Sequence, residues 1–102
     1  MTIEQIIYKN RAAGHHFFDY NWMHFFNTRV HEDVVGRNCF VTSECDDLAT
    51  FRDSAGNPVR VWNGERRFTV RRFNPADCQI ESVSEFGQFA TFDEAIEFAK
   101  AH

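Results

Sequence analysis

Arginine side chains on one predicted strand are the residues best suited to do chemistry. Four of the nine arginines lie between Arg66 and Phe73, where they are interleaved with Phe68 and other β-forming residues. Guanidinium groups and aromatic rings exposed on a sheet can clamp phosphates and stack bases of single-stranded nucleic acid. The same pattern fits a strand whose Phe68 faces the core and whose arginines pair with Glu81 and Glu85. We favour the second interpretation, because the net charge of −4 opposes binding to a nucleic-acid backbone.

The arginine strand is predicted to form a β-hairpin with residues 79–86 across the turn residues Asn74 to Asp77. Pairing of Phe73 with Cys78 would place Arg67 and Arg71 on one face with Ile80, Ser82 and Ser84. This register divides the arginines between the two faces of the sheet.

Metal binding and nucleophilic catalysis have little support in the sequence. Zinc accepts imidazole and thiolate ligands, but the histidines and cysteines follow no established metal-site spacing. The candidates are His15, His16, His24, His31, Cys39 and Cys45. Neither Cys45 nor Cys78 lies in a motif that supplies a base, and no nucleotide-binding or hydrolase motif is present. We therefore expect a non-enzymatic protein with no metal and no cofactor.

Acidic clusters are the second candidate binding feature. Carboxylates at Glu44, Asp46 and Asp47 could meet a basic groove on a partner protein, although solvated faces are the ordinary reading of such clusters. The turn residues between Asp53 and Pro58 predict a protruding hairpin tip that could also contact a partner. The predicted partner-binding residues are Glu44, Asp46, Asp47, Asp53, Asn57, Arg67 and Arg71.

The predicted elements are those of an α+β domain. A capping box at Thr2 and Gln5 starts a helix that ends near Gly14, and Asp19 or Asn21 could cap a second helix running to about residue 27. Strands are expected over residues 29–35 and 39–43, in a hairpin within 46–65, and in the 66–86 hairpin. A final helix is predicted from Phe92 to about residue 101, after a capping box at residues 91–94.

The chain of 102 residues predicts a single domain spanning residues 1–102. Hairpin-length connections predict an antiparallel sheet of about four to five strands, with two N-terminal helices and one C-terminal helix packed on one face. The opposite face is expected to carry the exposed arginines and serines. Three cysteines without a CxxC pair, and no apolar run long enough to span a membrane, predict a cytoplasmic protein with free thiols.

Five segments resemble a family of small uncharacterised proteins encoded by bacteriophages and other mobile elements of bacteria. They are Gly14–Phe18, Met23–Val30, Phe40–Glu44, Phe68–Phe73 and Phe86–Thr91. The similarity lapses over residues 46–65, which we interpret as a variable hairpin insertion. The family has no assigned activity or catalytic residues.

The resemblance implies a setting inside a bacterial host. Small acidic accessory proteins of such genomes often bind and block a host machine, including RNA-guided immune complexes, so an anti-CRISPR-like inhibitor is expected by analogy. The leading hypothesis is a protein that binds a host protein or nucleoprotein complex. The alternative hypothesis is a small nucleic-acid-binding protein that uses the arginine and aromatic side chains of the 66–73 strand.

Overall fold

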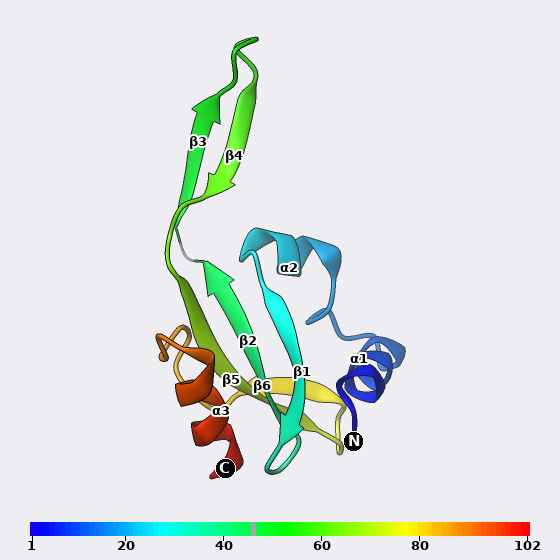
Figure 1. Ribbon diagram of the computed structural model, residues 1–102. Helices are drawn as coiled ribbons and strands as arrows, with labels where there is room; N and C mark the ends of the chain where they lie inside the picture. Colours follow the sequence, from blue (N-terminus) through cyan, green and yellow to red (C-terminus); the bar gives the residue numbers. More distant parts are fainter. Residues whose placement is uncertain (46) are drawn as a thin grey trace.

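The computed structural model describes residues 1–45 and 47–102, and it confirms the α+β class. A four-stranded antiparallel sheet has the order β1-β2-β5-β6, and a separate two-stranded sheet is made by β3 and β4 (Figure 1). The elements are α1 (Ile3–Ala12), α2 (Tyr20–Phe25), β1 (Arg29–Val35), β2 (Cys39–Cys45), β3 (Leu48–Arg52), β4 (Pro58–Trp62), β5 (Arg66–Asn74), β6 (Gln79–Ser82) and α3 (Phe92–Lys100). None of the described helices has the length and apolar character needed to cross a bilayer.

The helices begin where the sequence places their caps. Thr2 and Gln5 form both hydrogen bonds of the capping box of α1, and Gly14 follows its end with a φ of +82°. Asp19, one of the two predicted caps, accepts a hydrogen bond from the Asn21 amide at the start of α2. Thr91 caps α3 in the same way by accepting from the Glu94 amide.

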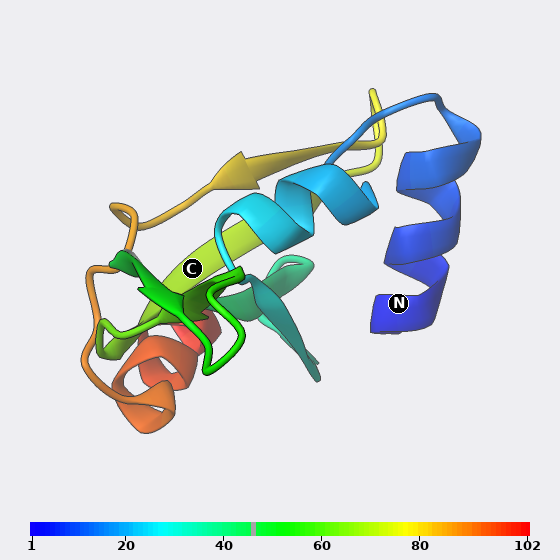
Figure 2. The ribbon, with the colours of Figure 1, turned by 90° about the horizontal axis from the view of Figure 1, so that it is seen from above.

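The two faces of the sheet are covered by different helices. Cys39, Val41 and Val70 point to one face, where they pack against Ala95 and Ala99 of α3. The alternate residues Phe40 and Phe73 point to the other face and pack against side chains of the N-terminal segment, namely Ile3, Ile6 and Phe18. The expectation that all three helices share one face is therefore wrong. Figure 2 shows α3 on one side of the sheet and the N-terminal helices on the other.

This two-sided cover buries the whole of β2. All seven of its residues are buried, including Thr42, Ser43 and Glu44. The predicted solvent-exposed sheet face of arginines and serines is consequently absent over β2 and the part of β5 that pairs with it.

The pairing of β5 with β6 differs from the predicted register by two residues. Asn74 pairs with Gln79 and Phe73 with Ile80, whereas the predicted register pairs Phe73 with Cys78. Cys78 lies inside the turn with a φ of +59°, a left-handed conformation that sequence reasoning did not assign to it. Because the shift is an even number, the side chains of β5 and β6 keep their predicted faces, and Arg71 lies opposite Ser82. The strand predicted to reach residue 86 ends at Ser82.

The hairpin of β3 and β4, residues 48–62, projects from the domain as an arm (Figure 1). The molecule measures 50 × 31 × 18 Å along its principal axes, and the arm accounts for its elongation. At the arm tip the Asp53 carboxylate accepts hydrogen bonds from the amides of Ala55 and Asn57. The protruding hairpin that the turn residues predict is confirmed.

Candidate partner-binding site at the base of the arm

Glu44 is a buried residue of the domain and not an exposed carboxylate. Only 1% of its surface is exposed, because its side chain points to the face covered by the N-terminal segment. One carboxylate oxygen lies 3.1 Å from the Arg71 guanidinium and 2.6 Å from the Thr42 hydroxyl. The other oxygen accepts from the Thr69 hydroxyl at 3.0 Å. These bonds replace the water that the charge loses on burial.

Arg71 completes this network from the neighbouring strand. Its Nε donates to the Thr42 hydroxyl at 3.2 Å, and its Nη1 donates to the Ser82 hydroxyl at 2.8 Å. Three aromatic rings surround the guanidinium at 5.3 to 5.9 Å, a distance at which cation–π attraction operates. They are Phe17, Trp22 and Phe86. Arg71 is therefore a structural cation and cannot clamp a ligand on the surface.

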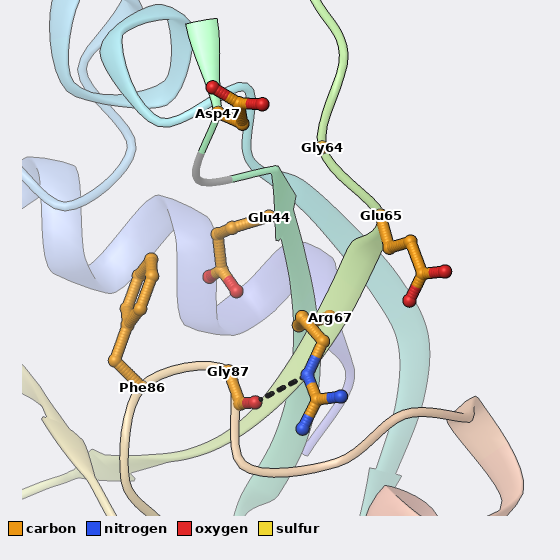
Figure 3. A pocket seen from close by; sticks show the side chains of 7 residues that line it. All are labelled: Glu44, Asp47, Gly64, Glu65, Arg67, Phe86 and Gly87. Carbon is orange, nitrogen blue, oxygen red and sulfur yellow. Dashed lines mark hydrogen bonds between the residues drawn. The ribbon is translucent and has the colours of Figure 1, made fainter.

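Arg67 fastens the loop that follows β6 to the sheet. Its Nε donates to the carbonyl of Gly87 at 2.8 Å, and Nη2 donates to the carbonyl of Gln88 at 3.1 Å. Figure 3 shows the guanidinium turned toward this loop. Gly87 has a φ of +64°, and an added Cβ there would lie 3.2 Å from the Cβ of Arg67. The contact thus fixes the place of the neighbouring Phe86.

A polar pocket of about 480 Å³ opens where the arm leaves the domain (Figure 3). Its lining residues are Glu44, Asp47, Gly64, Glu65, Arg67, Phe86 and Gly87. Asp47 and Glu65 are exposed, and the backbone carbonyl of Asp47 accepts from the Asn63 amide to close the base of the arm. In Figure 3 the carboxylates of Asp47 and Glu65 point away from that of Glu44. The arrangement does not gather the three carboxylates around one point.

An apolar groove lies on the other side of Phe86, between α2 and the arm. It has a volume of about 230 Å³ and is lined by Phe25, Phe26, Cys45, Leu48, Trp62 and Phe86. Phe25 is 69% exposed and Phe86 is 48% exposed, so two large aromatic side chains of the same groove are open to water. The rings of Trp22 on α2 and Phe26, the residue after the helix, lie 5.2 Å apart in a tilted contact, and the intervening Phe25 is left on the outer side.

The groove continues into a more polar section of about 450 Å³. This section shares Phe25, Leu48 and Trp62 with the apolar one and adds Asn21, His24, Asn27 and Arg60. Among the lining residues that the structure describes, Arg60 is the one that carries a permanent charge. We call the two sections together the arm groove. Sequence reasoning missed it, because its walls come from four separate parts of the chain, namely residues 21–27, residues 45 and 48, residues 60–62, and residue 86.

The arm also has an exposed apolar face that is turned away from the arm groove. Ala49 pairs with Val61 and Phe51 with Val59, so these four side chains lie on one face, opposite Leu48 and Trp62. Phe51 is 52% exposed, and both valines are about 40% exposed. Alternation of apolar and polar residues in both strands was the sequence signal that could have located this face.

The structure places the predicted partner-binding residues in three different settings. Glu44 and Arg71 are buried against each other, while Arg67 and Asp47 line the polar pocket. Asp53 and Asn57 lie at the arm tip, far along the molecule from the other four that the structure describes (Figure 1). Asp46 lies outside the described residues. The arginine strand does not form a stacking platform, because Phe73 is only 1% exposed and Arg71 is buried.

The histidines and cysteines considered for metal binding are dispersed. Within residues 1–45 and 47–102, no group of three metal-ligating side chains could hold an ion. His31 lies between the rings of Phe68 and Phe92, and its Nε2 is 3.3 Å from the hydroxyl of Ser43. Cys39 and Cys45 are buried as free thiols.

A small α+β domain with a projecting arm is the class that the fold and the site define. The chain belongs to a family of unknown function (DUF7447), whose model matches residues 2–55 and 59–100. Within the predicted variable insertion over residues 46–65, the match omits only residues 56–58. No curated protein and no solved structure matches the chain significantly.

Proposed function

We propose that this protein is a non-enzymatic accessory protein of a bacteriophage or mobile element, and that it binds and blocks a host protein or nucleoprotein complex. The setting rests on the family resemblance in the sequence, and inhibition of an immune complex, as by anti-CRISPR proteins, is an analogy. The host cytoplasm is the compartment in which such a partner would be met. The binding element is the arm together with the arm groove at its base.

The exposed apolar face of the arm is the observation that carries the proposal. A two-stranded hairpin is marginally stable alone, and this one offers Phe51, Val59 and Val61 to solvent on a projecting element. Contiguous apolar side chains of this kind mark interaction surfaces, because burying them in a partner removes them from water. The strand edges of the arm can also pair with a partner's strand.

The acidic residues take a smaller part than the sequence suggests. Charge reversal at Glu44 would place two like charges in the buried network with Arg71, so its effect on binding could not be separated from unfolding. Asp47 is exposed beside the arm and is the carboxylate at which a charge reversal tests the partner surface.

The test is capture of a partner by the tagged protein from a bacterial lysate, with and without nuclease, across a salt series and read by mass spectrometry. The double variant Phe51→Ser with Val59→Ser removes the apolar face of the arm. Tyr8→Ser is the matched control, because Tyr8 is an exposed aromatic residue on α1, outside the arm. We expect the wild type and Tyr8→Ser to capture the same protein after nuclease treatment, and the arm variant to lose it.

Titration of the captured partner separates stoichiometric blocking from catalysis. A blocker abolishes the partner's activity in proportion to the amount added, with an end point at a fixed molar ratio. Loss of activity at far smaller amounts, growing with time, would contradict the non-enzymatic proposal. Retention of the partner by the arm variant would contradict the assignment of the binding element.

Nucleic-acid binding is the competing proposal. It would now have to use Arg52, Arg60 and Trp62 of the arm, because the 66–73 strand is largely buried. Nucleic acid that co-purifies and is lost as salt rises, with a slope that Arg52→Ala and Arg60→Ala reduce, would favour it.

A further inference from the structure

We propose that the arm groove binds an extended acidic segment of the partner protein that carries an aromatic or aliphatic side chain beside a carboxylate. This inference rests on the proposed function and names the chemistry of the partner. It assigns a ligand to the surface between α2 and the arm, which is distinct from the apolar face on the far side of the arm.

The walls of the arm groove suit one large apolar side chain. Phe25 and Trp62 line both sections of the groove, and Leu48 lies beside Trp62 as its cross-strand partner. Phe86 closes the inner end, where it is held by the Arg67–Gly87 contact. An aromatic or branched aliphatic side chain inserted here would cover side chains that are now exposed to water.

The positive charge of the arm groove favours a negatively charged ligand. Arg60 is exposed, lies on the same arm face as Trp62, and makes no ion pair among the residues that the structure describes. No carboxylate belongs to the described lining of either section. A carboxylate on the ligand would therefore gain a charge-assisted hydrogen bond with Arg60 and meet no like charge among the described lining residues.

The residues that line the arm groove suit a polypeptide better than a nucleic acid. Asn21 and Asn27 line the polar section, and their amide groups can both donate to and accept from a peptide backbone. A nucleic acid would extend its phosphates beyond Arg60 to the exposed carboxylates of Asp47 and Glu65 at the arm base, where they would be repelled. A peptide can instead place one carboxylate at Arg60 and remain neutral elsewhere.

The experiment is selection from a random peptide library displayed on phage, with the full-length protein immobilised. The wild type is expected to enrich peptides in which Asp or Glu neighbours an aromatic or aliphatic residue. Arg60→Glu reverses the charge in the arm groove and is expected to replace these acidic residues by Lys or Arg. Arg52→Glu makes the same change on the same arm face outside the groove lining, and it should leave the selection as in the wild type.

Binding of one enriched synthetic peptide then gives the size of the effect by calorimetry. Arg60→Glu should weaken binding at least tenfold, the expected loss for one charge-assisted contact, whereas Arg52→Glu should leave the affinity unchanged. Circular dichroism confirms that both variants are folded.

Four outcomes would overturn the inference. The library could yield no enriched peptides, or peptides whose charge is unaffected by Arg60→Glu. A parallel selection from a random single-stranded DNA library could instead enrich ligands that depend on Arg60 and Trp62, which would assign the arm groove to nucleic acid. Partner capture that is lost in the Phe51→Ser, Val59→Ser variant but kept by Arg60→Glu would preserve the proposed function while rejecting this inference.

Discussion

At the residue scale, Glu44 and Arg71 form the interaction whose removal should cost the fold most. Both charges are withdrawn from water, and each hydrogen-bonds the hydroxyl of Thr42 as well as the other. A buried pair of this kind stabilises little compared with an apolar substitute, but the loss of one partner leaves an uncompensated charge. The pair therefore links β2 and β5 by a side-chain contact in addition to their backbone pairing.

We expect Glu44→Ala to lower the free energy of unfolding by about 3–5 kcal/mol, because Arg71 is left buried without its counter-charge. The double variant Glu44→Leu with Arg71→Met should lose less stability than Glu44→Leu and Arg71→Met lose together as single variants. Urea denaturation followed by tryptophan fluorescence gives the free energy of unfolding of all four variants. Additive losses would mean that the two side chains do not act as a pair.

His31 provides a pH dependence at the same scale. Burial and the neighbouring Arg66 guanidinium lower the pKa of His31 from its ordinary value of 6.5, against the opposite effect of Asp33 and Glu44. The hydroxyl of Ser43 accepts from Arg66, so its proton can be donated to the neutral Nε2 of His31. Protonation of the ring would remove this bond and place a cation beside Arg66.

Because the folded pKa is lowered, the unfolded chain binds the proton first as the pH falls. The contribution of His31 to stability is complete above pH 6.5 and is lost as the pH falls through the folded pKa. We expect His31→Gln to flatten the dependence of the urea midpoint on pH in this window. His16→Gln is the control, since the side chain of His16 is 86% exposed. Equal pH dependence in the wild type and His31→Gln would show that other groups cause it.

At the scale of the elements, the turn between β1 and β2 is fitted against the end of α3. Gly36 has a φ of +59°, and a Cβ there would lie 2.5 Å from the carbonyl oxygen of Ala99. Arg72 donates to the backbone carbonyl of His102 in the same region, at 2.6 Å. Glycine is required here for its conformation and for its lack of a side chain.

Gly36→Ala should therefore destabilise the domain more than Gly14→Ala does. Both positions are left-handed, which costs a residue with a Cβ about 1–2 kcal/mol. Gly14 has no atom within 4 Å of the added Cβ, whereas at Gly36 the last turn of α3 must move. Thermal unfolding of the two variants measures the difference in stability. Equal decreases would show that α3 can shift away from the added Cβ without destabilising the domain.

The helices and strands were largely predictable from the sequence, but the way in which the helices pack on the two faces of the sheet was not. Caps at Thr2 and Thr91 and the turn at Asp53–Asn57 are local signals, so the helices and the arm followed from them. The sequence of β2 suggests a half-exposed strand, because it contains the polar residues Thr42 and Glu44. Both can be buried only because side chains of β5 form hydrogen bonds with them. These hydrogen bonds join residues far apart in the sequence, so sequence patterns did not predict that the second face of the sheet is covered or that Glu44 and Arg71 are buried.

At the scale of the whole molecule, the arm is an addition to a domain that is complete without it. Among the described residues 47–65, none belongs to either of the two core clusters. The segment leaves the sheet at Cys45 and returns at Arg66, which are paired neighbours on β2 and β5. Its two ends therefore lie where a tight turn could join them.

Replacement of residues 46–65 by Asn-Gly, a pair that favours the tightest antiparallel turns, should yield a folded domain. We expect the amide signals of the NMR spectrum to remain dispersed and the free energy of unfolding to change by less than about 2 kcal/mol. Partner capture and peptide binding in the arm groove should both be lost. A collapsed spectrum would show that the arm also supports the domain, most directly through the contacts of Phe25 and Phe86 at its base.

The packing of α3 on the sheet has a consequence for biosynthesis. Val41 and Val70 can meet as soon as β5 has been made, yet the helix that covers them begins at Phe92. During translation the sheet face that α3 covers would remain exposed to water and to chaperones until the residues of α3, up to Lys100, had left the ribosome. A premature stop after β6 would therefore produce a chain with an uncovered sheet face, a substrate for quality-control proteases instead of a shortened but working protein.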